Sequence, residues 1–147
     1  MNLFKVLDIS GTALLAERQR AEVVTSNLAN AETTHAADGG PYKRMHVVFG
    51  AHPMHTNGFA GTLASFTDMN AEGVRVDRVV ADGAPPVRRF EPGHPDADAE
   101  GYVSYPAINP VEEIVNLMGA ARAYQLNASA VQSTKNMIQA SIDIIKS

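Results

Sequence analysis

The chain contains no cysteine and no tryptophan, and aromatic residues make up only 6% of its 147 residues. Without cysteine it can form neither disulfides nor thiolate zinc sites, and it has no thiol nucleophile. The same absence lets the chain exist in an oxidising compartment without mispaired disulfides. So few aromatic side chains are little material for one compact core, although 45% of the residues are hydrophobic, which is enough for globular burial or for helix seams.

Charge is also scarce, since charged residues form 19% of the chain and the formal net charge is −4. A weakly acidic chain has no general electrostatic attraction to nucleic acid. Its basic residues are scattered, apart from the pairs Lys43-Arg44 and Arg88-Arg89, which we interpret as solvated surface. No run approaches the roughly 20 apolar residues that a membrane-spanning helix needs. Asp8 and Ser10 interrupt the segment that a secretory signal would occupy, so we expect neither a membrane span nor a cleavable signal.

The clearest periodic pattern covers residues 110–146. Positions spaced alternately three and four apart are apolar or aromatic except at Lys135, whose aliphatic stem can lie along an apolar surface. The row consists of Ile114, Leu117, Ala121, Tyr124, Ala128, Val131, Lys135, Ile138, Ile142 and Ile145. Such heptad spacing predicts one long helix with a seam for another helix. Asn127, beside this row, is counted with it among the packing candidates.

The start of this helix carries its own signals. Asn109 is a good N-cap, Pro110 suits the first turn, and Glu112 lies three residues after the cap. Glu112 and Glu113 also suit the positive end of the helix dipole, and we interpret them as capping residues rather than a catalytic acid–base pair. A helix of this length would be roughly 55 Å long at about 1.5 Å per residue.

A second, less regular helical pattern covers residues 3–30. Its row is Leu3, Leu7, Ser10, Leu14, Glu17, Ala21, Val24 and Leu28. Leu7, Leu14, Ala21 and Leu28 are its packing candidates. An isolated antiparallel helix pair is marginally stable. Seams at both ends of the chain therefore favour packing against other chains, and the alternative is a small bundle folded back on the middle of the chain.

The middle of the chain, rich in glycine and proline, has the alternation of short strands. The candidates are residues 45–50, 73–82, 87–90 and 102–105, with 73–82 and 87–90 expected to pair as a hairpin across "APP". A further hairpin can form at Asn57-Gly58. The predicted fold is α+β, with helical segments 1–34 and 109–147 forming one inner helical domain and residues 35–108 forming a small β-rich, loop-rich insertion.

Candidate chemical sites are weak. Asp96, Asp98, Glu100 and Gly101 match the first half of a calcium loop, but its twelfth position is Ala107 instead of a bidentate glutamate. His52 and His55 flank Pro53, so a shared helix face is not expected. We predict no catalytic, cofactor or metal site. A small enzyme or metal-binding domain built on residues 93–101, and a cytosolic helical adaptor or export-associated binding protein, are the competing hypotheses.

The segment "SNLANAETT" closes the first helical pattern and poses a question. Asn27 and Asn30 can present their amides to a ligand from one helix face, or they can end the helix and satisfy its backbone. Their spacing fits both.

Longer motifs supply a resemblance. "ERQRAEVVTSNLANAETT", "GGPYKR", "GVRVDRVVADGAPPVRRFEPGHPDADAEGYVSYP" and "NPVEEIVNLMGAARAYQLNASAVQSTKNMIQASI" occur in order over most of the chain. They resemble the flagellar basal-body rod proteins, and among them the FlgC family of proximal rod subunits. The chain departs from that family in having isoleucine at Ile114, near which methionine is usual, and alanine after Pro106 where asparagine is usual.

This resemblance implies a structural, non-enzymatic subunit that is exported unfolded, without signal cleavage, by the flagellar type III apparatus. It implies assembly into a hollow, torque-transmitting rod across the periplasm, with terminal helices lining the export channel and a small outer β domain. The implied partners are copies of itself, other rod subunits and the ring or export-gate adaptor at the rod base. Asn27 and Asn30 would then be helix-end residues that tie the last turn to the next segment and to neighbouring subunits.

Overall fold

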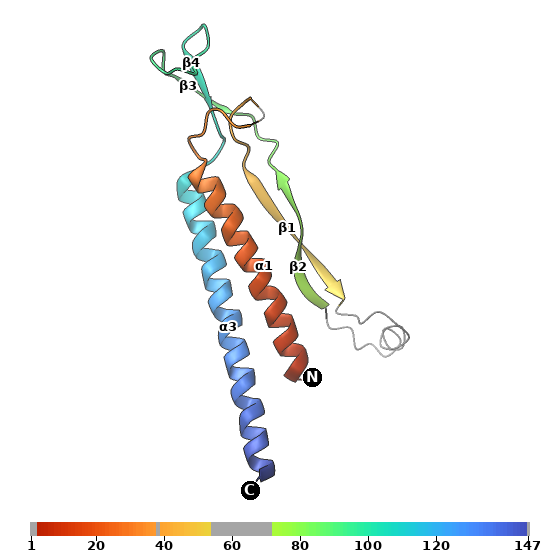
Figure 1. Ribbon diagram of the computed structural model, residues 1–147. Coiled ribbons are helices and arrows are strands. Elements are labelled where there is room, and N and C mark those ends of the chain that lie inside the picture. The colour runs from red at the N-terminus through yellow and green to blue at the C-terminus, as the bar shows by residue number, and fades with distance from the viewer. Residues whose placement is uncertain (1–2, 38, 54–71, 147) are drawn as a thin grey trace. The chain divides into compact units, whose positions relative to one another are not determined.

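A computed structural model of the chain describes residues 3–37, 39–53 and 72–146 (Figure 1). Along the sequence its elements are α1 (Leu3–Ala29), β1 (Met45–Pro53), β2 (Glu72–Ala81), β3 (Val87–Phe90), β4 (Tyr102–Tyr105) and α3 (Pro110–Lys146). A helix at each end of the chain therefore flanks a region of short strands, and the fold is α+β as predicted. The bounds of both helices agree with the periodic patterns in the sequence to within one residue.

The four expected strands are all present, but the predicted pairing of β2 with β3 is wrong. β2 pairs with β1, and β3 pairs with β4. The N–H of Asp82 extends the first ladder by donating to the C=O of Arg44 at 2.7 Å. Pro85 and Pro86 follow, and because proline has no N–H it cannot continue a ladder into β3. The predicted hairpin at Asn57-Gly58 lies outside the described residues.

β3 and β4 form an antiparallel hairpin in which Val87 lies opposite Tyr105 and Phe90 lies opposite Tyr102. The loop between the two strands closes with hydrogen bonds of its own, including Glu91 N–H to Gly101 C=O at 2.9 Å. This local closure explains why β3 pairs with the strand that follows it rather than with the one before it.

The chain divides into two compact units. One consists of Met1–Gln19, Phe49–Asp77 and Ala120–Ser147, and the other of Arg20–Val48 and Arg78–Gly119. The boundary falls within both helices and within β1 and β2, so each unit contains part of each of these elements. The division into an inner helical domain and an outer β domain stays a prediction.

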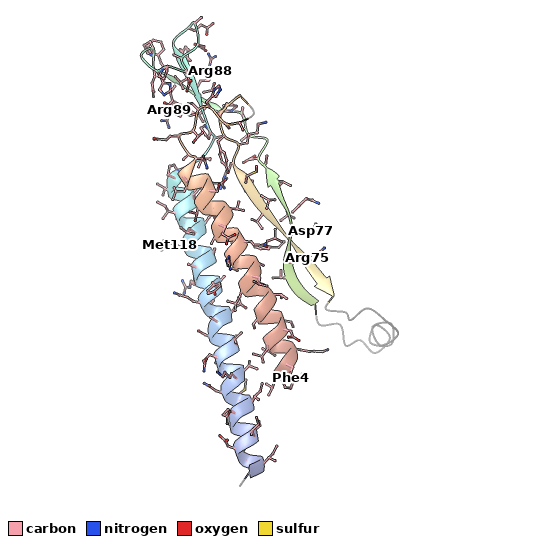
Figure 2. All side chains as sticks on the ribbon, in the orientation of Figure 1. Phe4, Arg75, Asp77, Arg88, Arg89 and Met118 are labelled. Atoms are coloured by element: carbon pink, nitrogen blue, oxygen red, sulfur yellow. The ribbon has the colours of Figure 1, made fainter. Side chains whose placement is uncertain are left out.

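In the first unit, β2 comes very close to α1 at a glycine. The N–H of Val74 donates to Thr12 Oγ1 at 3.1 Å. A Cβ on Gly73 would lie 2.8 Å from that same oxygen, which is shorter than any ordinary contact, so only glycine permits this approach. Beyond the glycine the strand alternates as predicted, with Arg75 and Asp77 exposed and forming an ion pair of 3.7 Å (Figure 2).

The row predicted for α1 faces the interior of the fold. Each of its eight residues is buried or half-buried: Leu3, Leu7, Ser10, Leu14, Glu17, Ala21, Val24 and Leu28. The most fully buried hydrophobic side chains of the described residues are mostly small, among them Ala16, Val24, Val103 and Ala120. No helix in the described ranges is long and apolar enough to cross a membrane.

Candidate functional site: a polar junction and an exposed helix face

Asn27, in the last turn of α1, is 1% exposed and bonds both backbone groups of Met45, the first residue of β1. Its Nδ2 donates to the Met45 C=O at 2.8 Å, and its Oδ1 accepts the Met45 N–H at 2.9 Å. The carboxamide therefore pairs with β1 as the backbone of a neighbouring strand would. Tyr42 donates its hydroxyl to the same Oδ1 at 3.2 Å. A short side chain with a donor and an acceptor in one plane is required here, and asparagine supplies both.

The remaining donor of Asn27 reaches a buried carboxylate in the first turns of α3. Asn27 Nδ2 donates to Glu113 Oε2 at 3.0 Å, and Glu113 is 1% exposed. Arg44 neutralises this charge, because its Nε donates to Glu113 Oε1 at 2.9 Å and its Nη2 also bonds that oxygen. Asn116 adds a longer contact to Oε1 at 3.4 Å. Each carboxylate oxygen thus has a donor, as a buried charge requires.

We call Asn27, Tyr42, Arg44, Met45 and Glu113 the polar junction. The interpretation of Arg44 as solvated surface is wrong, because its side chain is 19% exposed and pairs with Glu113. The description of Glu113 as a capping residue missed this pair, since Arg44 lies 69 residues away in the sequence. Neither the residue types nor their formal charges indicate from the sequence that Arg44 and Glu113 form a pair.

Asn30 ends α1 with bonds inside its own segment. Its Nδ2 donates to the Ser26 C=O at 2.9 Å, and its Oδ1 accepts the hydroxyl of Thr33 at 3.2 Å. Thr34 then donates to Asp96 Oδ2 at 2.7 Å, which connects the segment after α1 to the loop between β3 and β4. The amides of both asparagines are therefore engaged within the chain.

The start of α3 has side-chain capping. Asn109 Oδ1 accepts the N–H of Val111 at 3.0 Å, and the Asn109 C=O accepts the N–H of Glu113 at 3.1 Å. Pro110 is the first helical residue, and Glu112 is exposed. This turn places Glu113 one position beyond Glu112, on the face that contains the polar junction.

The row of α3 that is buried within the chain lies one residue earlier than the predicted row. Glu113, Ala120 and Thr134 are buried, and Asn127 between them is half-buried, so inward residues recur every seven positions. They are small or polar. Of the predicted row, Leu117, Val131 and Ile138 are half-buried, whereas the exposed members are Ile114, Ala121, Tyr124, Ala128, Lys135, Ile142 and Ile145.

The same helix presents large apolar side chains outward. Val111, Val115 and Met118 lie on successive turns of one side of α3, and Leu126 and Met137 lie farther along the same side. All five are between 50% and 67% exposed, and we call them the outer stripe. Figure 2 shows Met118 projecting from α3. The heptad pattern did not predict this stripe, because its residues lie outside the longest apolar row of the helix. An extended apolar surface of this kind is typical of protein contact surfaces.

The calcium-like loop uses its acids for its own backbone. Asp98 Oδ1 accepts the N–H groups of Tyr102 at 2.8 Å and Glu100 at 3.0 Å, and Oδ2 pairs with Arg88. These bonds, the one from Tyr102 first, lower the pKa of Asp98. Gly101 turns the chain with φ of 84°, a conformation that suits glycine. Among the described residues no three histidines, aspartates or glutamates are grouped as a metal site would need.

Aromatic and arginine side chains stabilise the hairpin. The guanidinium of Arg88 lies 4.8 Å from the ring centre of Tyr102, and that of Arg89 lies 4.6 Å from the ring centre of Tyr105. Tyr105 donates its hydroxyl to Glu91 at 2.8 Å, and this bond raises the pKa of Tyr105. The Arg88-Arg89 pair stays at the surface, as the sequence predicted.

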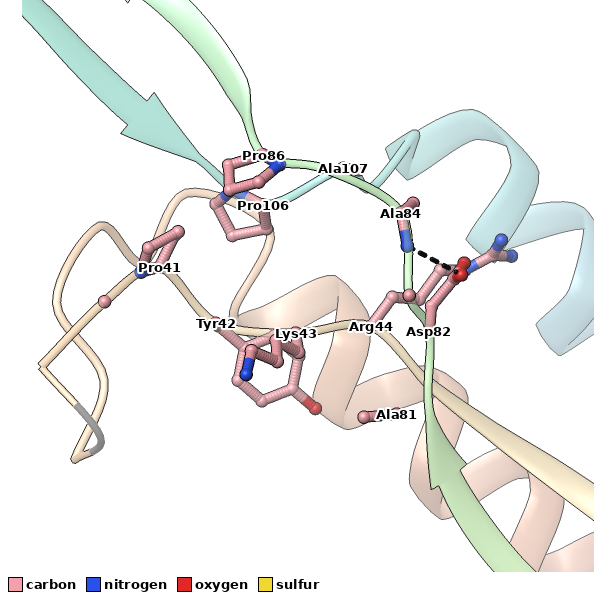
Figure 3. Close-up of a pocket in the computed structure, with 12 residues that line it drawn as sticks. Pro41, Tyr42, Lys43, Arg44, Ala81, Asp82, Ala84, Pro86, Pro106 and Ala107 are labelled. Atoms are coloured by element: carbon pink, nitrogen blue, oxygen red, sulfur yellow. Dashed lines mark hydrogen bonds between the residues drawn. The ribbon is translucent and has the colours of Figure 1, made fainter.

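A recess of about 430 Å³ lies beside the polar junction in the second unit (Figure 3). Pro41, Pro86 and Pro106 contribute to its lining together with Arg44 and Asp82. Asp82 accepts a hydrogen bond from His46 at 3.1 Å and another from the N–H of Ala84 at 3.1 Å, which lower its pKa. The Asp82 side chain thus binds His46 and Ala84, and together with the bond from the Asp82 N–H to the Arg44 C=O these contacts stabilise the end of the β1–β2 ladder.

The fold and the site define a structural protein: two long helices, one with a small or polar inner row and an apolar outer stripe, and a polar junction that ties them to the strands. Comparison with known sequences agrees. A family model described as "Flagella basal body rod protein" matches residues 7–36, and one described as "Flagellar basal body rod FlgEFG protein C-terminal" matches residues 99–144.

Relatives align over nearly the whole chain. The flagellar basal-body rod protein FlgC of Borreliella burgdorferi is 33% identical, over 99% of each chain. The FlgC proteins of Escherichia coli O6:H1 and Bacillus subtilis are 40% and 34% identical, over 94% and 99% of this chain and 94% and 100% of their own. The chain therefore belongs to the FlgC family of flagellar basal-body rod proteins. Members are structural components of the rod and associate with other rod components.

Proposed function

We propose that this chain is a structural subunit of the proximal rod, which self-assembles through its terminal helices into a hollow axial shaft that transmits torque and surrounds the export channel. The observation that carries the proposal is the outer stripe of α3. A helix that turns small or polar residues inward and large apolar residues outward is suited to contact with further helices. Membership of the FlgC family supports the rod as the place of that contact.

In this proposal residues 1–34 and 109–147 form the inner helical layer, and residues 35–108 form the outer part. The exposed members of the predicted α3 row contact neighbouring subunits together with the outer stripe. The half-buried members Leu117, Val131 and Ile138, with Asn127, support the helix from within the chain. Asn27 and Asn30 shape the junction between the two parts, and Asn109, Pro110 and Glu112 set the start of the packing helix.

The partners that we propose are copies of the same chain, other rod subunits, and the ring or export-gate adaptor at the rod base. The chain reaches the periplasm-spanning rod through the flagellar type III apparatus, without a cleaved signal. Its lack of cysteine suits that oxidising compartment. We propose a structural rather than a catalytic role: among the described residues, Asp98 serves a turn, Asp82 binds at the end of the β1–β2 ladder, and Glu113 belongs to the polar junction.

The test is a paired substitution in the outer stripe. Met118→Gln with Leu126→Gln changes two side chains that are 67% and 65% exposed, so the unfolding midpoint of the purified chain should stay the same. In cells whose only copy of the gene carries both changes, rods and motility should be lost. Gln125→Ser, an exposed polar position on the same helix, is the control and should leave motility intact. Normal rods and motility in the paired variant would refute the proposal.

A further inference from the structure

The polar junction joins segments that are far apart in the sequence. Asn27 and Met45 are separated by 18 residues, Arg44 and Glu113 by 69, and Asn27 and Glu113 by 86. The junction thus joins the end of α1, the start of β1 and the first turns of α3, all within the second unit. Arg44 also accepts the Asp82 N–H through its C=O, so the end of β2 is attached to the same residue.

The bonding capacity of the Asn27 carboxamide is fully used in this one arrangement. The carboxamide of Asn27 donates twice and accepts twice, and both oxygens of Glu113 accept donors. Apolar helix contacts, by contrast, tolerate several alignments, because similar ridges and grooves recur along a helix. A slip of α1 against α3 by one helical turn is about 5.4 Å and would separate Asn27 from Glu113, which are bonded at 3.0 Å.

A buried ion pair is a weak source of stability, because two charges lose their water when they are buried. Buried polar groups can instead select one alignment among several, as a single buried asparagine does in coiled coils. The inner row of α3, which consists of Glu113, Ala120, Asn127 and Thr134, is small or polar, and the larger Leu117 and Val131 beside it are only half-buried. Side-chain shape therefore does less than the polar junction to distinguish neighbouring alignments.

We propose that the polar junction is a register lock: it fixes the last turn of α1 against the first turns of α3 and sets Met45 as the first residue of β1. Its contribution is to alignment rather than to stability. The lock is a property of the isolated chain and does not depend on the proposed role in the rod.

The test measures alignment directly. Because the chain has no cysteine, cysteines introduced at Ala29 and Met118, both exposed, can carry spin labels without background labelling. The full-length chain should give one narrow distance distribution. Arg44→Met with Glu113→Leu should leave the chain folded, with the unfolding midpoint lowered only by the loss of the hydrogen bond from Asn27 to Glu113. It should nevertheless give a broad or split distribution with components displaced by about one turn, 5.4 Å.

Matched controls use the exposed neighbours. Lys43→Met with Glu112→Leu removes one positive and one negative charge at adjacent positions and should leave the distribution narrow. Arg44→Lys keeps the charge but loses the two-point contact of the guanidinium, so it should broaden the distribution while the chain stays folded.

Three results would overturn the proposal. A broad distribution in the parent chain would mean that no register is fixed. A narrow, unshifted distribution in the Arg44→Met and Glu113→Leu variant would mean that the pair is not needed. Loss of folding in that variant would mean that the pair supplies stability rather than alignment. A normal rod phenotype would bear on the proposed function alone.

Discussion

Replacing Asn27 with aspartate is the smallest change that disrupts the polar junction. The two side chains have nearly the same size, but aspartate at neutral pH cannot donate to the Met45 C=O or to Glu113, which lie 2.8 and 3.0 Å from Asn27 Nδ2. Each buried acceptor left without a donor costs about 1–3 kcal/mol. A second carboxylate about 3 Å from Glu113 adds repulsion of roughly 5 kcal/mol at an effective dielectric constant near 20.

Protonation of the introduced carboxyl limits this repulsion, because taking up a proton at pH 7 costs about 4 kcal/mol for a group with an ordinary pKa of about 3.9. We therefore expect Asn27→Asp to lower the free energy of unfolding by about 4–6 kcal/mol at pH 7.5, a large part of a typical 5–15 kcal/mol. Circular dichroism during urea unfolding of the full-length chain measures this quantity.

The pH dependence gives a second signature. The introduced carboxyl has a higher pKa in the folded state than in the unfolded state, so the folded state binds the proton more tightly. The difference in free energy of unfolding between the parent and the variant should therefore become smaller as the pH falls from 7.5 to 5. Asn30→Asp is the matched control, since Asn30 is half-buried and donates only to the Ser26 C=O, and it should cost about 1 kcal/mol. Equal losses in the two variants, or a loss below about 1 kcal/mol for Asn27→Asp, would refute the reasoning.

Three further predictions concern the hairpin and α3. Because the pKa of Asp98 is lowered in the folded chain, its contribution to stability is complete above the ordinary aspartate pKa and is lost as the pH falls through the lower native pKa. Asp98→Asn should therefore make the free energy of unfolding depend less on pH in the acid range. The same acid dependence in the variant and the parent would contradict this. Gly101→Ala should destabilise the hairpin by about 1–2 kcal/mol, because the residue has a positive φ and the added Cβ would lie 3.0 Å from Phe90. Amide exchange in β4 measures this loss. Gly93→Ala, with nothing within 4 Å of the added Cβ, should change the exchange rates little, and equal rates in the two variants would contradict the prediction. Asn109→Ala should cost about 1 kcal/mol by removing the cap on Val111, measured by urea unfolding, and Glu112→Gln nearby should cost less; the reverse order would contradict the assignment of the cap.

The helices were predictable from sequence because their signals are local. Asn109 and Pro110 mark the start of α3, and a heptad row that is apolar or aromatic except at Lys135 extends almost to its end. The face of α3 was less predictable. Ile114 and Glu113 begin adjacent heptad rows. Hydrophobicity predicts that the row beginning at Ile114 is buried, yet in the structure the row beginning at Glu113 faces inward. A helix that contacts both its own chain and others has two seams, and periodicity alone does not say which is internal.

Strand positions were predictable for the same local reason, but strand partners were not. Alternation around Arg75 and Asp77 identifies β2, whereas its pairing with β1 depends on contacts between segments that are distant in the sequence. Pro85 and Pro86 end the ladder before β3. The polar junction shows the same limit. The spacing of Asn27 and Asn30 drew attention to these residues, but nothing local connects Asn27 with Arg44 or Glu113.

In the proposed rod, other subunits cover the outer stripe of α3. A cysteine introduced at Leu126, the single thiol in an otherwise cysteine-free chain, allows its exposure to be measured by the rate of maleimide labelling. We predict rapid labelling in the purified chain and labelling at least tenfold slower in isolated basal bodies that contain the same variant. Equal labelling rates in the two preparations would contradict the account.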